Sequence, residues 1–284
     1  AMEANPGTFE QARFAGFREA GINRLSIGIQ SFNEQHLQAL GRIHSGDDAR
    51  HAVRKAREIG FNNINLDLMH GLPDQTPQQA LQDLHTAIDL HPEHLSWYQL
   101  TIEPNTEFHN RPPRLPEDEA LWAIQEQGQA LLAAQGFAQY EISAYSQPGR
   151  QARHNLNYWR FGDYLGIGAG AHGKITWPAQ DLIQRRWKQR QPKAYINALN
   201  PCTGEQLINA DERPFEFMMN ALRLTSGVEA TLFTQHTGLS LQTVEAALTQ
   251  ARRQGLLTEY RAELAPSEQG RLFLNDLLEL FLDA

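Results

Sequence analysis

The chain has 284 residues, of which 41% are hydrophobic and 20% charged, and its net charge is −8. This composition is typical of a soluble globular protein with one large domain or two ordinary ones, and no apolar run approaches the roughly 18 residues that span a bilayer. The acidic balance argues against a nucleic-acid-binding protein, because contacts to phosphates need a basic face. The single cysteine, Cys202, allows no internal disulfide and no thiolate metal cluster, and it fits the reducing cytoplasm.

Helical patterns and short apolar runs alternate along the first hundred residues. The predicted helices cover 8–20, 34–40, 47–59 and 77–91, with Asn33 or Ser31 and then Thr76 as N-caps and Pro77 in the first turn. The predicted strands cover 24–30, 63–69 and 95–102. Strands and helices in this order predict right-handed βαβ units and a parallel sheet.

Beyond the third predicted strand, the regular alternation of helices and strands ends. A helix is expected over 117–135 and a strand over 140–145, followed by an irregular, glycine-rich segment. From residue 213 onward the pattern is mostly helical, and residues 237–258 are typical of a winged helix. We therefore expect three regions, at 1–146, 147–211 and 212–284.

Four polar residues fall at or just after the ends of successive predicted βα units: Glu3, Gln30, Arg42 and Asp67. Ligands of parallel α/β sheets bind outside the carboxyl ends of the strands. Asp67 interrupts an otherwise buried strand, where a carboxylate needs a partner. Any one of these residues alone is equally well explained as a solvated strand end or a helix cap, but four in succession favour a binding site.

Several motifs resemble those of the oxygen-independent coproporphyrinogen III oxidase family of radical S-adenosylmethionine (SAM) enzymes, and in particular its heme-chaperone branch. They are residues 3–7 (EANPG), 26–31 (SIGIQS), 40–44 (LGRIH), 65–73 (NLDLMHGLP), 104–106 (PNT) and 154–159 (HNLNYW). The resemblance covers nearly the whole chain. It implies an α/β fold, namely an incomplete (βα) barrel followed by a mainly helical, winged-helix-like C-terminal domain.

The resemblance also implies a SAM site. It places Arg42 on the methionine carboxylate, Glu3 at the amino-acid end of the ligand, and Gln30 and Asp67 on the ribose hydroxyls. The backbone at Thr101 is placed beside the adenine. A guanidinium suits a carboxylate, and an amide with a carboxylate suits a diol.

The sequence departs from the family in the part that binds the 4Fe-4S cluster. The family carries Cys-x-x-x-Cys-x-x-Cys after its first strand and a glycine-rich turn after its second, and neither occurs here. With Cys202 alone the chain cannot hold the cluster, so we expect no SAM cleavage and assign no catalytic residue. We further expect that the sequence is either a truncated form, with Ala1 as a tag remnant, or the product of an internal or misassigned start.

A second constellation, His154-Asn-Leu-Asn-Tyr158-Trp159, suits an iron porphyrin, because imidazole is an axial ligand and aromatic rings pack on the macrocycle. Taken alone, such a histidine is more often a satisfied core residue. In the heme-chaperone branch the same motif is associated with heme binding, which implies heme contacts from His154, Tyr158 and Trp159, with His154 on the iron. His172 lies among glycines, which suit either a close ligand or a tight loop.

Residues 172–200 carry six cations against Asp181, a net +5, which indicates either a solvated basic face or a receiver for porphyrin propionates. Residues 241–284 carry seven acids and four arginines, a net −3, which excludes DNA contact by the winged-helix-like end. We read that end as a packing or partner-docking module.

These observations predict a heme-binding and heme-trafficking protein whose partners are heme or porphyrin and heme-accepting proteins. The alternatives are a coproporphyrinogen III oxidase, which decarboxylates propionates by radical chemistry, and a plain protein-interaction domain. We also expect self-association, because in an incomplete barrel the strand over 24–30 would lack a neighbour and expose Leu25, Ile27 and Ile29.

Overall fold

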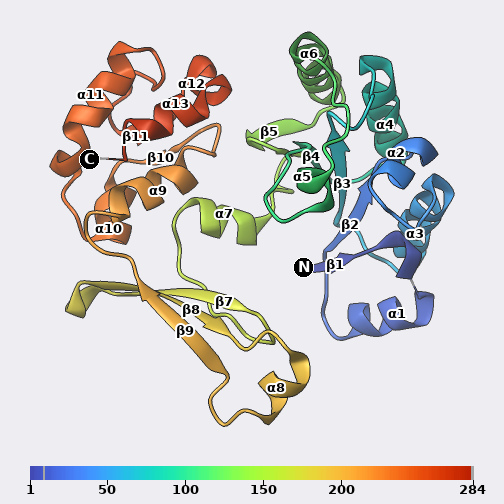
Figure 1. The fold of residues 1–284 in the computed structure, drawn as a ribbon, viewed down its shortest axis with the longest axis horizontal. Coiled ribbons are helices and arrows are strands. Elements are labelled where there is room, and N and C mark those ends of the chain that lie inside the picture. Colours follow the sequence, from blue (N-terminus) through green and yellow to red (C-terminus); the bar gives the residue numbers. More distant parts are fainter. Residues whose placement is uncertain (9, 283–284) are drawn as a thin grey trace. The chain divides into compact units, whose positions relative to one another are not determined.

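The computed structural model describes residues 1–8 and 10–282, and the chain divides into two compact units, Ala1–Gln151 and Ala152–Ala284 (Figure 1). None of the described helices is both long and apolar enough to cross a lipid bilayer.

The first unit is built on a six-stranded sheet in the order β1-β2-β3-β4-β6-β5. Its strands are β1 (Met2–Ala4), β2 (Leu25–Gln30), β3 (Ile64–His70), β4 (His94–Gln99), β5 (Ala138–Glu141) and β6 (Ala144–Ser146). Its helices are η1 (Pro6–Thr8), α1 (Gln11–Glu19), α2 (Glu34–Ala39), α3 (Gly46–Glu58), α4 (Pro77–Asp89), α5 (Glu107–Asn110) and α6 (Asp118–Ala134). Strands β1 to β4 pair in parallel, which confirms the predicted βαβ order.

Local sequence explains where the helices begin. Asn33 accepts backbone N–H bonds at the start of α2. Thr76 forms a capping box with Gln79, and Pro77 occupies the first turn of α4. These caps satisfy N–H groups that have no partner within the helix, and they confirm the N-caps predicted at Asn33 and Thr76.

The two faces of the parallel strands differ in chemistry. Leu25, Ile27 and Ile29 of β2 are fully buried in the apolar core, which also takes in residues of α3, α4 and α6. The alternate residues of β2, β3 and β4 are mostly polar and hydrogen-bond to one another on the opposite face. This polar face carries the first candidate site.

Two expectations for the first unit are wrong. Strand β2 does not lack a neighbour, because β1 pairs with it, Met2 opposite Leu25, and the apolar side chains of β2 are covered. The argument for self-association through that strand therefore fails. The strand expected over 140–145 is the hairpin β5–β6, since the chain turns at Ile142 and Ser143. The described strands form an open sheet and not a closed barrel.

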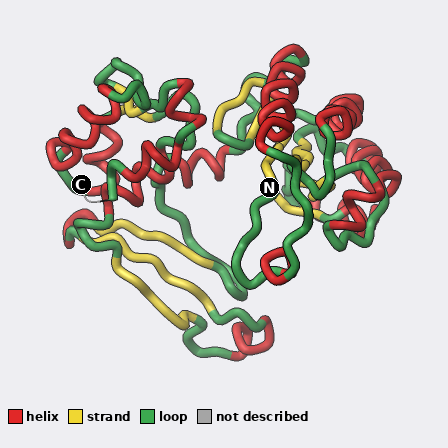
Figure 2. Tube along the Cα trace, turned by 45° about the horizontal axis from the view of Figure 1, so that its top comes forward, coloured by secondary structure: helices red, strands yellow, loops and turns green. Residues whose placement is uncertain are grey.

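The second unit combines a three-stranded antiparallel sheet with a helical C-terminal part. The sheet consists of β7 (His172–Trp177), β8 (Leu182–Lys188) and β9 (Cys202–Leu207), drawn in yellow in Figure 2. The other elements are α7 (Arg153–Trp159), η2 (Pro178–Gln180), α8 (Pro192–Asn197), α9 (Arg213–Ala221), β10 (Val228–Glu229), α10 (Thr231–Thr237), η3 (Leu241–Val244), α11 (Glu245–Arg253), β11 (Glu263–Leu264), α12 (Glu268–Leu272) and α13 (Leu274–Glu279).

The segment 147–211, expected to be irregular, is therefore ordered into α7, α8 and this sheet. These three strands could not be predicted from the sequence, because they carry charged and aromatic residues and lack a strict alternation of apolar and polar residues. The described C-terminal part, with the five α-helices α9 to α13, the short η3 and the small β10–β11 pair, agrees with the mainly helical, winged-helix-like expectation.

Candidate functional site

A polar cluster lies at the carboxyl end of β2 and β4. The Tyr98 hydroxyl of β4 donates a 2.8 Å hydrogen bond to Oε1 of Gln30, the last residue of β2. Gln30 is 5% exposed and has a φ of 70°, a left-handed conformation that is costly for a residue other than glycine. Gly28 makes room for it, because a Cβ there would lie 3.0 Å from the Gln30 amide nitrogen.

The carboxylate of Asp67 is held on the same face of the sheet. Its Oδ2 accepts from the Ser26 hydroxyl at 2.8 Å, and its Oδ1 accepts from Asn65 Nδ2 at 2.8 Å. Asn65 Oδ1 lies 2.6 Å from Nδ1 of the buried His94, whose Nε2 lies 2.8 Å from the Tyr140 hydroxyl. A neutral His94 that donates from Nδ1 and accepts from Tyr140 satisfies this chain of hydrogen bonds.

Arg42 and Thr101 line a cavity of about 510 Å³ in the first unit, together with Met69, Leu100 and Phe108. Arg42 follows Gly41, whose φ of 67° ends the turn after α2, and its side chain is exposed. The Thr101 hydroxyl donates to Glu103 at 2.9 Å. The cavity thus offers a guanidinium beside an apolar wall.

Tyr98 links these groups electrostatically. Burial raises the pKa of Tyr98, the charges of Asp67 and Glu3 raise it further, and the charge of Arg42 lowers it. Glu3 itself is exposed on β1, opposite Ser26 of β2. Of the five residues expected at the SAM site, Gln30 contacts Tyr98, the charges of Asp67, Arg42 and Glu3 act on the Tyr98 hydroxyl, and Thr101 shares the cavity with Arg42.

Tyr98 was missed by sequence reasoning, although a signal was present. Ser96 and Tyr98 alternate along the strand predicted over 95–102, so they share one face. The donor set of this site, a guanidinium, a carboxylate and an amide, fits the carboxylate, diol and amine of SAM. It does not fit a 4Fe-4S cluster, which needs several thiolates where this sequence has one cysteine.

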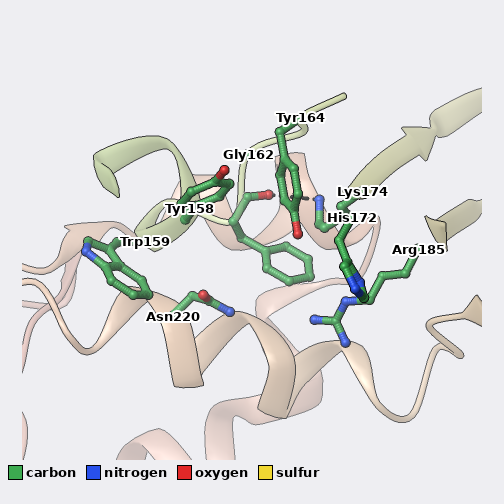
Figure 3. Close-up of a pocket in the computed structure, with 9 residues that line it drawn as sticks. Tyr158, Trp159, Gly162, Tyr164, His172, Lys174, Arg185 and Asn220 are labelled. Atoms are coloured by element: carbon green, nitrogen blue, oxygen red, sulfur yellow. Dashed lines mark hydrogen bonds between the residues drawn. The ribbon is translucent and has the colours of Figure 1, made fainter. Parts of the chain in front are cut away.

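A second cavity, of about 420 Å³, lies within the second unit (Figure 3). Aromatic rings dominate its lining, with a histidine and two cations at one side: Tyr158, Trp159, Phe161, Tyr164, His172, Lys174 and Arg185. Tyr158 and Tyr164 meet edge to face with 4.6 Å between their centroids. Its volume is within the roughly 300–1,000 Å³ range of ligand sites.

Backbone pairing places Tyr164 and His172 together at this cavity. Tyr164 and Lys174 exchange two backbone hydrogen bonds of 3.0 Å. A Cβ at Gly166 would lie 2.3 Å from the carbonyl oxygen of His172, so only glycine allows this approach. Gly166 therefore serves the packing of the chain's own backbone.

Both cations of the cavity already have carboxylate partners. The Lys174 ammonium is 2.7 Å from Asp163 Oδ1, and Arg185 makes a bidentate pair with Glu216 at 2.7 and 2.6 Å. Burial lowers the pKa of Lys174, against the opposing effect of Asp163. Burial also acts to raise the pKa of Asp163, but its hydrogen bonds from Lys174 and Thr176 outweigh this and lower it.

The expected heme residues are only partly brought together. Tyr158 and Trp159, on α7, line the cavity, and the Trp159 ring stacks with the Arg223 guanidinium at 4.3 Å. His154 is exposed one turn earlier and meets Tyr158 edge to face at 6.4 Å, but it is not among the described residues that line the cavity. His172, in contrast, does line the cavity. Its ring stacks on that of Trp187, with 6.3 Å between the two ring centroids.

The described residues contain no group of three or more histidine, cysteine or acidic side chains that could hold a bare metal ion. An iron porphyrin differs from a bare ion because the macrocycle supplies most of the iron ligands, so that the protein adds only axial ones. The second cavity can accordingly offer aromatic contact and an imidazole.

Comparison with known proteins gives a consistent result. Residues 1–87 match the radical SAM superfamily, and residues 208–273 match the HemN C-terminal domain. The chain is 53% identical to the heme chaperone HemW of Escherichia coli over 99% of this chain and 74% of that protein, and 53% identical to HemW of Haemophilus influenzae over 99% and 73%. HemW of Bacillus subtilis is 35% identical over 99% and 75%.

Among solved structures, the chain resembles the radical SAM enzyme coproporphyrinogen III oxidase (HemN) from Escherichia coli. The TM-score is 0.79 at 21% identity, over 99% of this chain and 69% of that one. This likeness shows that the fold is that of the coproporphyrinogen oxidase group.

Proposed function

The chain belongs to the HemW family of heme chaperones within the radical SAM superfamily, and we propose from this that it binds heme and passes it to other proteins. The observation that carries the proposal is the aromatic cavity of the second unit, with Tyr158 and Trp159 in its wall. Heme is bound by such rings and by an axial imidazole. The proposed compartment is the cytoplasm, where Cys202 stays reduced.

Within this proposal His154 is the axial ligand of the iron, and Tyr158 and Trp159 contact the macrocycle. The ring of His154 lies beside Tyr158, at the end of α7 that precedes the cavity wall. His172 provides a second imidazole, from β7. Substitution of each histidine separately decides between them.

The electrostatics of the cavity favour heme over coproporphyrinogen. Coproporphyrinogen carries more carboxylates than heme and calls for unpaired cations around it. Lys174 and Arg185 are already engaged with Asp163 and Glu216, which leaves less positive charge for additional carboxylates. The cavity is therefore better suited to a largely apolar macrocycle with few carboxylates.

We assign the first unit to SAM. In this assignment Arg42 binds the methionine carboxylate, Glu3 the amino group, and Gln30 with Asp67 the ribose, while the backbone at Thr101 lies by the adenine. SAM bound to a 4Fe-4S cluster supplies radical chemistry in the superfamily. The residues present here support binding and orientation of SAM only, because the thiolates for the cluster are not in this sequence.

Titration of residues 1–284 with heme and with coproporphyrin III, followed by quenching of tryptophan fluorescence, tests the proposal. We expect heme to bind more tightly than coproporphyrin III. The opposite order would favour the oxidase, and the absence of binding by either would leave a protein-interaction domain.

A further inference from the structure

Two loops lie together at one end of the β7–β8–β9 sheet, where Figure 1 shows α8. Because the strands are antiparallel, the start of β7, the end of β8 and the start of β9 share this end. We call residues 165–171 and 188–201, which surround it, the tip. The Gly168 N–H donates to the Tyr195 hydroxyl of α8 at 3.1 Å, and backbone hydrogen bonds also join the loops. The tip is therefore a preformed surface.

The tip exposes large aliphatic side chains. Leu165, Ile167, Ile196 and Leu199 are each at least 74% exposed. Single apolar residues on a protein surface are normal, whereas several in adjoining segments form a patch that marks an interaction site. The tip therefore differs from a merely solvated basic face.

The tip also carries positive charge without counter-charges. It contains Lys188, Arg190 and Lys193 and no acidic residue, a net +3 in a chain whose net charge is −8. In the part of the chain that the structure describes, none of the three forms an ion pair, whereas both cations of the second cavity are paired. Exposed cations of this kind attract and orient a partner of opposite charge.

The tip adjoins the second cavity in sequence and in space. His172, which lines the cavity, directly follows the first loop of the tip. The backbone of Gly166 in that loop packs against the His172 carbonyl group. A protein bound to the tip is therefore held beside the wall of the cavity to which heme binding is assigned.

We propose that the tip is the docking surface for the heme-accepting protein, and that this partner presents an apolar patch ringed by carboxylates beside its heme crevice. The proposal rests on the proposed heme function, and it adds the location of the docking surface and the chemistry of the partner.

The observations favour a protein over an anionic lipid surface as the occupant. Three cations are fewer than the roughly four to eight that are typical of lipid-binding clusters. The exposed aliphatic residues come from hydrogen-bonded loops and the six-residue α8, and not from a long amphipathic helix of the kind that lies in a membrane interface.

The first test follows heme transfer from residues 1–284 to apocytochrome b5, an acidic b-type hemoprotein, by its Soret band. We expect the transfer rate to rise with the concentration of apocytochrome and to fall with ionic strength. The triple variant Lys188→Glu, Arg190→Glu, Lys193→Glu should transfer heme at least about tenfold more slowly, with unchanged heme affinity. The control is Arg54→Glu, Arg253→Glu, Arg271→Glu, which makes the same charge change at exposed positions outside the tip and should leave the rate within about twofold.

The second test measures docking without heme. Calorimetry should show that Ile167→Ser with Ile196→Ser weakens binding of the heme-free chain to apocytochrome b5 at least about tenfold. Leu272→Ser with Leu282→Ser, at exposed positions elsewhere in the second unit, is the control and should have little effect.

A transfer rate independent of apocytochrome concentration, or equal effects of the tip and control variants, would overturn the proposal. So would unchanged transfer by tip variants that no longer sediment with phosphatidylglycerol vesicles, which would assign the tip to lipid. Failure of the unmodified chain to bind heme would instead contradict the proposed function, and the calorimetry of the heme-free chain would still decide whether the tip docks an acidic protein.

Discussion

The ammonium of Lys174 lies 2.7 Å from the carboxylate of Asp163 and donates as well to the carbonyl oxygen of Phe161 at 3.0 Å. The Lys174 side chain is 4% exposed, whereas that of Asp163 is 42% exposed. The pair therefore joins a buried cation at the wall of the second cavity to a partner at the surface. Lys174 also lies 4.2 Å from the centre of the Phe161 ring, and both residues line the cavity.

We predict that Asp163→Asn lowers the free energy of unfolding by about 1–3 kcal/mol, because it leaves a buried ammonium without its counter-charge but with other acceptors. The exposed pair Arg186–Glu205, at 3.6 Å, supplies the control, and Glu205→Gln should cost less than about 1 kcal/mol. Urea unfolding of the two variants measures both values. Equal effects would show that the burial of Lys174 has no consequence.

His70 makes the first unit sensitive to acid. Burial lowers the pKa of His70 to about 4, against an ordinary value of 6.5. Because the folded state resists protonation, the stability that His70 contributes is present above pH 6.5 and is lost as the pH falls towards 4. Between pH 7 and pH 5 we expect a loss of about 2 kcal/mol, which His70→Gln should abolish. The exposed His85, replaced by Gln, is the control and should leave the loss unchanged.

Asp83 has the opposite effect on the pH dependence of stability. Burial raises its pKa to about 6, although the Ser31 hydroxyl and the Phe32 N–H bond to it at 2.6 and 2.8 Å. The folded state therefore binds a proton more readily than the unfolded state does, and stability is lost as the pH rises from 4 through 6. Asp83→Asn should remove about 1 kcal/mol of stabilisation on acidification from pH 7 to pH 5. An acid-induced change identical to that of the unmodified chain would contradict this.

The single thiol gives a prediction about the cluster. After anaerobic reconstitution with iron and sulfide, residues 1–284 should show no 4Fe-4S absorption and should not cleave SAM, because several thiolates are needed and only Cys202 is present. Cys202→Ala should behave in the same way. Cleavage of SAM above background by this polypeptide would refute the expectation.

The parallel sheet was predictable from the sequence because two local signals agree there. Apolar residues such as Leu25, Ile27 and Ile29 are buried in a core with residues of α3, α4 and α6, and caps such as Thr76 mark where the helices start. The pairing of β1 with β2 was missed because β1 has only three residues, too few for a pattern. Strands β7 to β9 were missed because side chains such as Lys174 and Arg185 are placed by partners distant in sequence.

At the candidate sites too, residues within local motifs could be predicted, whereas contacts between residues distant in the sequence could not. Gln30, Arg42 and Asp67 could be singled out because they are polar residues within recognisable motifs, although only Gln30 ends a strand, since Arg42 follows α2 and Asp67 lies in the middle of β3. The hydrogen bond between Tyr98 and Gln30 spans 68 residues and leaves no local trace. In the same way the motif points to His154, while His172 reaches the cavity through the pairing of β7 with β8.

The central claim, that the second unit binds heme through α7, is tested most directly by one Soret-band titration of three proteins: the unmodified chain, His154→Ala and the control His85→Ala. We expect saturable binding by the unmodified chain and the control, and at least about tenfold weaker binding by His154→Ala with unchanged far-UV circular dichroism. Undiminished affinity of a folded His154→Ala would remove His154 as the ligand, and if His172→Ala then lost binding, the imidazole would be that of β7. No Soret shift with the unmodified chain would contradict the account as a whole.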